Sequence, residues 1–292
     1  MPKLIDLLHM GTPGAIAVYL IDLDGPTLVD CGPATCHDAL VAGLESHGVP
    51  LADLRRILLT HIHPDHAGGA GALVARHPSL DVHVHHVGAP HVVDPSRLLG
   101  SARRLYGDED YDRLFGDILP IPEERVHVLG ERIGRLEVIE TPGHAWHHVA
   151  YLDPDDGSCI AGDAAGVVFQ PGRFLYPASA PPEIDVPAWL GAIDRLAARA
   201  PASLWISHFG RIEDEPLAHL ARLRERLVDW SSRVETGATL DEYAALAEAA
   251  LRAESPGDDL HDLLLLSPTW AMSYAGVKRY YDKRREREAD GA

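Results

Sequence analysis

The sequence predicts an α/β fold that is followed by a helical region. Short β-branched and apolar runs, which are typical of strands, alternate with helix-type patterns from residue 15 to residue 211. Beyond Arg211 the apolar residues recur three and four positions apart, which is the period of helices. We therefore expect a core of residues 1–212 and a helical C-terminal extension of residues 213–292 that packs on it.

Length and composition indicate a globular protein. A chain of 292 residues with 46% hydrophobic and 24% charged residues can bury a substantial core. Neither a membrane span nor a signal peptide is expected, because no apolar run reaches about 18 residues and the first residues lack the charged, apolar and small segments of such a signal. The three cysteines are odd in number and fit reduced intracellular thiols. We expect a cytoplasmic protein.

The acidic net charge of the chain argues against nucleic acid as its partner. The formal net charge is −18 at pH 7, whereas binding to nucleic acid depends on Lys and Arg side chains that neutralise phosphates. One basic cluster, residues 278–287, falls on a predicted terminal helix, where it is typical of a solvated face. We expect a small-molecule substrate as the partner, and neither nucleic acid nor a membrane.

The first predicted elements are a hairpin and a helix. Residues 15–23 and 27–31 are rich in strand-forming side chains, and the Asp24-Gly25 pair between them is a hairpin signal. Residues 38–47 have the pattern of a short helix, which Gly48 closes.

A histidine-rich motif follows the next strand. Residues 57–59 are an apolar run typical of a buried strand, and residues 60–69 read T-H-I-H-P-D-H-A-G-G. In extended backbone His61 and His63 share one face, while Asp65 and His66 come after the chain turns at Pro64 into a helix. Imidazole and carboxylate ligands together are typical of zinc, manganese or iron, and two metal ions need more ligands than this motif holds. We therefore expect further ligands from elsewhere in the chain.

A second histidine patch occurs in residues 81–87. Its alternation places His83 and His85 on one face of a strand and His86 on the other. The patch lacks a carboxylate and a turn that would gather the ligands. We interpret these three residues as structural or surface residues.

Three later strand ends carry ligand-type side chains. Strand signals occur at residues 125–129, 136–140, 149–152, 158–161 and 204–207, and helical patterns at 96–106, 111–115 and 186–199. His144 follows the tight turn of Pro142-Gly143 after one strand. Asp163 and His208 each follow another of these strands.

Together these motifs resemble the metallo-β-lactamase superfamily of metal-dependent hydrolases. The resemblance covers residues 15–211 and implies a four-layer αβ/βα sandwich with the C-terminal helices added to it. Asp30 matches the first acidic motif of the family. The resemblance implies that this carboxylate supports the histidine motif by hydrogen bonds without touching metal.

The resemblance also implies two divalent metal ions, with zinc expected and manganese or iron as the alternatives. The implied ligands are His61, His63 and His144 for one ion, Asp65, His66 and His208 for the other, and Asp163 as the bridge between them. A hydroxide shared by the two ions would attack the substrate. Asp65 and Asp163 are the catalytic candidates, and Asp65 could also orient the hydroxide.

The resemblance leaves several reactions open. Acidic charge disfavours RNA processing, and the apolar loop residues favour an ester, thioester or lactone over a phosphodiester. The alternatives are a phosphodiester hydrolase and a mononuclear iron-dependent dioxygenase that acts on a persulfide. A non-catalytic metal-binding protein is a further alternative, which the intact ligand set disfavours.

Two loops supply the candidate substrate contacts. In the family, the loop equivalent to residues 9–14 borders the active site, which makes His9 and Met10 candidates. The Pro-rich residues 170–185 leave the strand that delivers Asp163, which makes Phe174 and Tyr176 candidates. In related enzymes, added helices like those of residues 213–292 cover the active-site mouth or build a homodimer.

Overall fold

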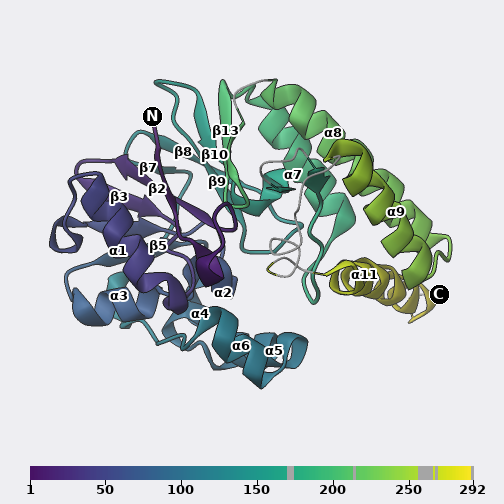
Figure 1. The fold of residues 1–292 in the computed structure, drawn as a ribbon, viewed down its shortest axis with the longest axis horizontal. Coiled ribbons are helices and arrows are strands. Elements are labelled where there is room, and N and C mark those ends of the chain that lie inside the picture. Colours follow the sequence, from purple (N-terminus) through teal and green to yellow (C-terminus); the bar gives the residue numbers. More distant parts are fainter. Residues whose placement is uncertain (170–173, 213–214, 256–265, 267–268, 291–292) are drawn as a thin grey trace.

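The computed structural model describes residues 1–169, 174–212, 215–255, 266 and 269–290. Two six-stranded sheets face each other, with helices on the outer side of each (Figure 1). The predicted four-layer αβ/βα sandwich is confirmed, and so are the additional C-terminal helices. Among the described residues, no helix has the length and apolar character that would let it cross a membrane.

The first sheet contains the strands in chain order. Its members are β1 (Lys3–Asp6), β2 (Ala17–Asp22), β3 (Pro26–Val29), β4 (Arg56–Leu58), β5 (Asp81–Val84) and β6 (Val126–Val128). The first three strands pair antiparallel, and β3 to β6 pair parallel. Because the crossovers between parallel strands are helical, α1 (His37–Ser46) and α3 (Ala70–Arg76) come to cover the outer face (Figure 1).

The second sheet has the order β14-β13-β10-β9-β8-β7. Its strands are β7 (Arg132–Ile133), β8 (Leu136–Glu140), β9 (Val149–Leu152), β10 (Ser158–Ile160), β13 (Ser203–Ile206) and β14 (Gly210–Ile212). Helices α7 (Val186–Ala198) and α8 (Pro216–Glu235) pack on its outer face through one apolar cluster. The sheet is therefore buried on both faces, which explains why β9, β10 and β13 are buried at every position.

Side-chain alternation in β2 shows how the layers are built. Ala17, Tyr19 and Ile21 belong to the cluster between the two sheets, whereas Val18 and Leu20 belong to the cluster under the outer helices. Tyr19 meets Trp205 of the opposite sheet edge-to-face, with ring centroids 5.5 Å apart. Each face of a strand thus contributes to a different core.

The C-terminal extension packs around a small hairpin. The hairpin strands are β11 (Val167–Phe169) and β12 (Phe174–Tyr176), and the helices are α8, α9 (Leu240–Glu254) and α11 (Trp270–Asp290). Phe174 and Tyr176 contact Trp230 and Trp270 from these helices. A capping box of Thr239 and Glu242 starts α9.

Short helices join the strands. They are α2 (Pro64–Ala67), α4 (Ala89–Val93), α5 (Ser96–Tyr106), α6 (Asp108–Phe115), and the 3-10 turns His9–Gly11, Ala34–Cys36, Leu51–Asp53, Glu123–Arg125 and Gly162–Ala165. The strand predicted for residues 81–87 ends at Val84, because the carbonyl of His85 accepts hydrogen bonds from the Gly88 and Ala89 amides and starts a turn. His85 and His86 therefore leave the sheet.

Replacing Trp189 tests the core beneath the second sheet. This side chain is fully buried, and its Nε1 donates a hydrogen bond of 2.9 Å to the Ala164 carbonyl. We expect Trp189→Ala to lower the free energy of unfolding of the metal-free protein by about 3–5 kcal/mol, measured by urea denaturation. Trp146→Ala is the control, because Trp146 is 49% exposed, and it should change the value by less than about 0.5 kcal/mol.

Candidate metal centre

Seven ligand-type side chains meet at one edge of the sandwich. They all follow the carboxyl ends of strands from both sheets: His61, His63, Asp65 and His66 after β4, His144 after β8, Asp163 after β10 and His208 after β13. The structure thus brings together all seven metal ligands that the resemblance implies. The donor atoms fall into groups whose members lie within 4.8 Å of one another.

The first group is made of three imidazoles. His63 Nδ1 lies 3.0 Å from His61 Nε2 and 3.2 Å from His144 Nε2. Burial lowers the pKa of all three rings, to about 3 for His63, so each presents a neutral nitrogen. One proton can join only two of these nitrogens, whereas a cation accepts a lone pair from all three. The donor set therefore fits a metal ion.

The second group mixes carboxylates and imidazoles. His208 Nε2 lies 3.3 Å, and His66 Nε2 3.7 Å, from Asp65 Oδ2. Asp163 stands between the groups, with Oδ1 3.5 Å from His66 Nε2 and Oδ2 3.5 Å from His144 Nε2. His66 Nε2 and Asp163 Oδ1 are buried and have no hydrogen-bond partner. When the His66 ring is neutral, both of these atoms offer a lone pair, and a cation between them would satisfy both.

Opposite charges determine the protonation states around Asp163. Burial would raise the pKa of Asp163, but His66 and His208 outweigh burial and hold this pKa well below its usual range. Burial would likewise lower the pKa of His66, but Asp163 and Asp65 raise it well above its usual value. Without a cation, these imidazoles carry the compensating positive charge.

Hydrogen bonds made by the Nδ1 atoms fix the orientation of the ligand rings. His61 Nδ1 donates to Thr60 Oγ1, which donates to Asp30 Oδ2 at 2.8 Å, and His66 Nδ1 donates to the same oxygen at 2.9 Å. His144 Nδ1 donates to the Ala178 carbonyl at 3.0 Å. In the neutral form of each ring, Nε2 therefore keeps its lone pair for the metal position. Asp30 therefore acts as the resemblance implies.

His208 and His148 complete this support. His208 Nδ1 donates to the Ala15 carbonyl at 2.7 Å. His148 Nδ1 donates to Thr141 Oγ1, and its Nε2 accepts the Asp163 amide proton at 3.2 Å. His148 thus holds the backbone of Asp163.

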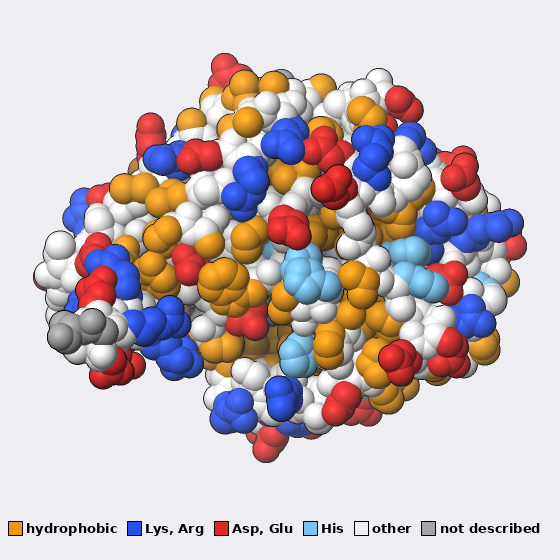
Figure 2. All heavy atoms as spheres, turned by 180° about the vertical axis from the view of Figure 1, so that it is seen from behind, with side chains coloured by type: hydrophobic (Ala, Val, Ile, Leu, Met, Phe, Trp, Pro, Cys, Tyr) orange, Lys and Arg blue, Asp and Glu red, His pale blue; other side chains and the backbone are white. Residues whose placement is uncertain are grey.

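Five of the seven ligands, His63, Asp65, His144, Asp163 and His208, line a cavity whose other described lining residues are mostly apolar, with hydroxyls at Ser101 and Tyr106. Its other lining side chains include Leu98, Ala102, Leu105, Tyr106, Val167, Val168, Ala178, Pro181, Pro182 and Leu266. Among the described residues, no Lys or Arg lines it. Figure 2 shows histidine side chains in the middle of one face with hydrophobic side chains around them. Helix α5, which the helical pattern of residues 96–106 predicts, supplies several of the wall residues, but the pattern does not reveal that they line a cavity.

The four predicted substrate contacts lie outside this cavity wall. Phe174 and Tyr176 are fully buried in the core under α8 and α11, so the prediction that they contact substrate is wrong in this structure. His9 is buried beside Cys36, with Nδ1 3.5 Å from Sγ, and Met10 is exposed. Burial lowers the pKa of His9 to about 4, although Asp65 opposes this. Residues 170–173 of the same predicted loop lie outside the described residues.

Two other histidines gain carboxylate partners from distant strands and loops. Glu140 Oε1 lies 3.5 Å from His85 Nε2, and Glu183 Oε2 lies 3.1 Å from His147 Nε2. The backbone amide of Val87 donates to His85 Nδ1, and that of Ile62 donates to His147 Nδ1. In both neutral rings the proton therefore sits on Nε2, which leaves no lone pair there for a metal. His85 remains a structural residue, although its patch does have a carboxylate.

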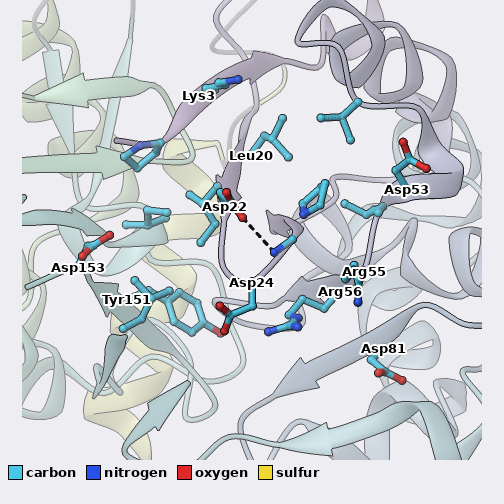
Figure 3. A pocket seen from close by; sticks show the side chains of 18 of the residues that line it. Lys3, Leu20, Asp22, Asp24, Asp53, Arg55, Arg56, Asp81, Tyr151 and Asp153 are labelled. Atoms are coloured by element: carbon cyan, nitrogen blue, oxygen red, sulfur yellow. Dashed lines mark hydrogen bonds between the residues drawn. The ribbon is translucent and has the colours of Figure 1, made fainter. Parts of the chain in front are cut away.

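A second cavity lies at the other end of the sandwich, around the turn from β2 to β3 (Figure 3). It is lined by side chains of both charges, such as Asp24, Asp53, Arg55 and Arg56. These residues lie before or at the start of β3 and β4, whereas the seven ligands follow the carboxyl ends of their strands. None of the ligands lines this cavity, so the candidate chemistry belongs to the edge with the histidines.

Single substitutions should separate ligands from other histidines. His63→Ala and Asp163→Asn should each release metal, because each removes a donor from the centre. His85→Ala should leave the metal content unchanged, since His85 Nε2 faces Glu140. Elemental analysis per chain gives the answer, and equal metal loss in His63→Ala and His85→Ala would contradict this placement of the site.

Metal binding should release protons. Burial would lower the pKa of His66 and His208, but Asp163 and Asp65 outweigh burial and raise both pKa values, so these rings hold their second proton to a higher pH than a free imidazole does. Ligation requires the neutral ring, and zinc added at pH 7 should therefore release protons. The release should decrease as the pH rises through these pKa values. A pH-indicator titration measures it, with His208→Ala expected to release fewer protons.

Comparisons with known proteins agree with this geometry. A hydroxyacylglutathione hydrolase of Rhodopseudomonas palustris (strain HaA2) is 33% identical over 126 residues, which are 42% of this chain and 38% of that protein. A solved metallo-β-lactamase family protein of Thermus thermophilus has a TM-score of 0.65 at 23% identity. The match covers 94% of this chain and 89% of the Thermus chain. The di-iron-bound form of TTHA1623 has a TM-score of 0.53 at 28% identity. The match covers 71% of this chain and 93% of the TTHA1623 chain.

The family model of the metallo-β-lactamase superfamily matches residues 11–203, about two thirds of the chain. This range contains six of the seven ligands, and His208 follows it by five positions. With the sandwich and its histidine-lined edge, this match shows that the chain belongs to the metallo-β-lactamase superfamily and is a metal-dependent hydrolase.

Proposed function

We propose that this hydrolase cleaves a small-molecule ester, thioester or lactone with an apolar acyl group. The observation that carries this proposal is a cavity that contains residues of the metal centre and whose other described lining residues are mostly apolar. Pockets of this composition bind ligands through buried apolar surface, and a few polar groups orient the reacting atoms.

The chain's own residues would orient the reactants. Two divalent ions bound at the seven ligands supply hydroxide at neutral pH and polarise the substrate carbonyl as Lewis acids. Asp65 lines the cavity, and although burial would raise the pKa of its carboxyl, His66 and His208 hold that pKa well below its usual range. An ionised carboxylate in this position accepts a hydrogen bond from the attacking water and directs it.

Tyr106 presents a hydroxyl to the cavity, as does Ser101. It lines the cavity from α5, and burial together with the negative charges of Asp65 and Asp163 raises the pKa of its phenol. The phenol therefore keeps its proton at neutral pH and can donate a hydrogen bond to a carbonyl oxygen. The sequence patterns gave no sign of this residue.

The residues that line the metal cavity indicate which class of substrate it can bind. Anionic groups that lie away from the metal ions are usually bound by cationic side chains, and the described wall has neither Lys nor Arg, which disfavours an anionic carrier. The hydroxyacylglutathione hydrolase to which the chain is similar supports thioester cleavage as the reaction type. The di-iron-bound relative supports iron as an alternative to zinc.

Metal content and a substrate panel test the proposal together. We expect close to two metal ions per chain by elemental analysis, and turnover of an apolar lactone, ester or thioester but not of a phosphodiester. Asp163→Asn should lose this turnover, and His85→Ala should keep it. One iron per chain, with oxygen uptake on a persulfide and no hydrolysis, would instead assign the chain to the iron-dependent dioxygenases.

A further inference from the structure

We propose that the C-terminal helix α11 positions the metal ligand His144. The helix holds residues 176–179, and the carbonyl of Ala178 in this segment orients the His144 ring. The inference depends on the metal centre but not on the reaction proposed above, so it can be tested by metal binding alone.

The first contact is a close approach of two backbones. Gly276 of α11 is buried against the carbonyl of Ser179 and the nitrogen of Pro181. A Cβ atom on residue 276 would overlap with the Ser179 oxygen and would lie 3.0 Å from the Pro181 nitrogen. The overlap is with backbone, which cannot swing away as the end of a flexible side chain could. Any side chain at this position therefore displaces the segment from the helix.

The second contact is a hydroxyl that binds the segment at two points. Ser273 lies one helical turn before Gly276 and is fully buried. Its Oγ accepts the amide proton of Ser179 at 3.2 Å and also a hydrogen bond from the Tyr176 hydroxyl. One side chain of α11 thus fixes both ends of residues 176–179.

The held segment contacts the metal centre directly. Between the two anchored residues, the Ala178 carbonyl accepts the Nδ1 proton of His144 at 3.0 Å. This bond assigns the tautomer and directs the lone pair of Nε2 towards His63 Nδ1, 3.2 Å away. The alignment of one metal ligand therefore depends on a helix that begins only at Trp270.

The effect should be confined to one of the two metal positions. His144 belongs to the group with His61 and His63. In the other group, His66 is oriented by Asp30 and His208 by the Ala15 carbonyl, and both of these supports come from the N-terminal part of the chain. A merely structural role of α11 would lower stability without distinguishing between the two positions.

The experiment is a titration of the metal-free protein with Co²⁺ alone, in competition with a chelator. We expect Ser273→Ala and Gly276→Ala to weaken one of the two binding steps by about 10- to 100-fold and to shift the visible cobalt spectrum of that step. The other step should keep its affinity. Gly191→Ala in α7 is the matched control, because the nearest atom to its added Cβ is the end of the Arg195 side chain at 3.5 Å.

The two variants keep the inference falsifiable. Ser273→Ala removes a hydroxyl and adds no volume, so it should still fold, as circular dichroism can check, if Gly276→Ala does not. Unchanged affinity for both cobalt ions in folded Ser273→Ala would overturn the inference, and so would an equal loss at both steps. Neither result would bear on which substrate is hydrolysed, since the titration contains none.

Discussion

The buried carboxylate of Asp30 is the interaction on which the candidate site depends. Asp30 directly follows β3, and its oxygens accept hydrogen bonds from the Thr60 amide and hydroxyl, from the His66 ring and, at 3.4 Å, from the Ser207 hydroxyl. An unpaired carboxylate would be costly in this interior, so these donors have little freedom to move. They belong to the histidine motif and to the end of β13. One anion thereby joins both sheets beside the ligands.

Local signals explain why much of this arrangement can be predicted from the sequence. The apolar run before His61, the turn of Pro142-Gly143 before His144 and the strand before His208 each fix where a strand stops. The ends of adjacent strands meet at one edge of a sheet, and the ligands therefore converge there. The strands of residues 136–140 and 149–152 have the predicted bounds for the same reason.

Packing between distant segments could not be predicted in this way. The helical pattern of α5 is visible, but the sequence does not tell that its side chains line the metal cavity. Phe174 and Tyr176 looked like loop residues near Asp163, yet they are covered by helices from the far end of the chain. The carboxylates Glu140 and Glu183 reach His85 and His147 only through the tertiary fold. Each of these contacts depends on tertiary packing, which local periodicity does not encode.

The distribution of the ligands over both sheets links metal binding to the stability of the folded protein in a cell. Four ligands follow a strand of the first sheet and three follow strands of the second, so an unfolded chain cannot present them together. A metal ion that binds only the folded form shifts the folding equilibrium by mass action. The supply of metal would then govern resistance to proteolysis and the amount of protein that accumulates, as well as activity.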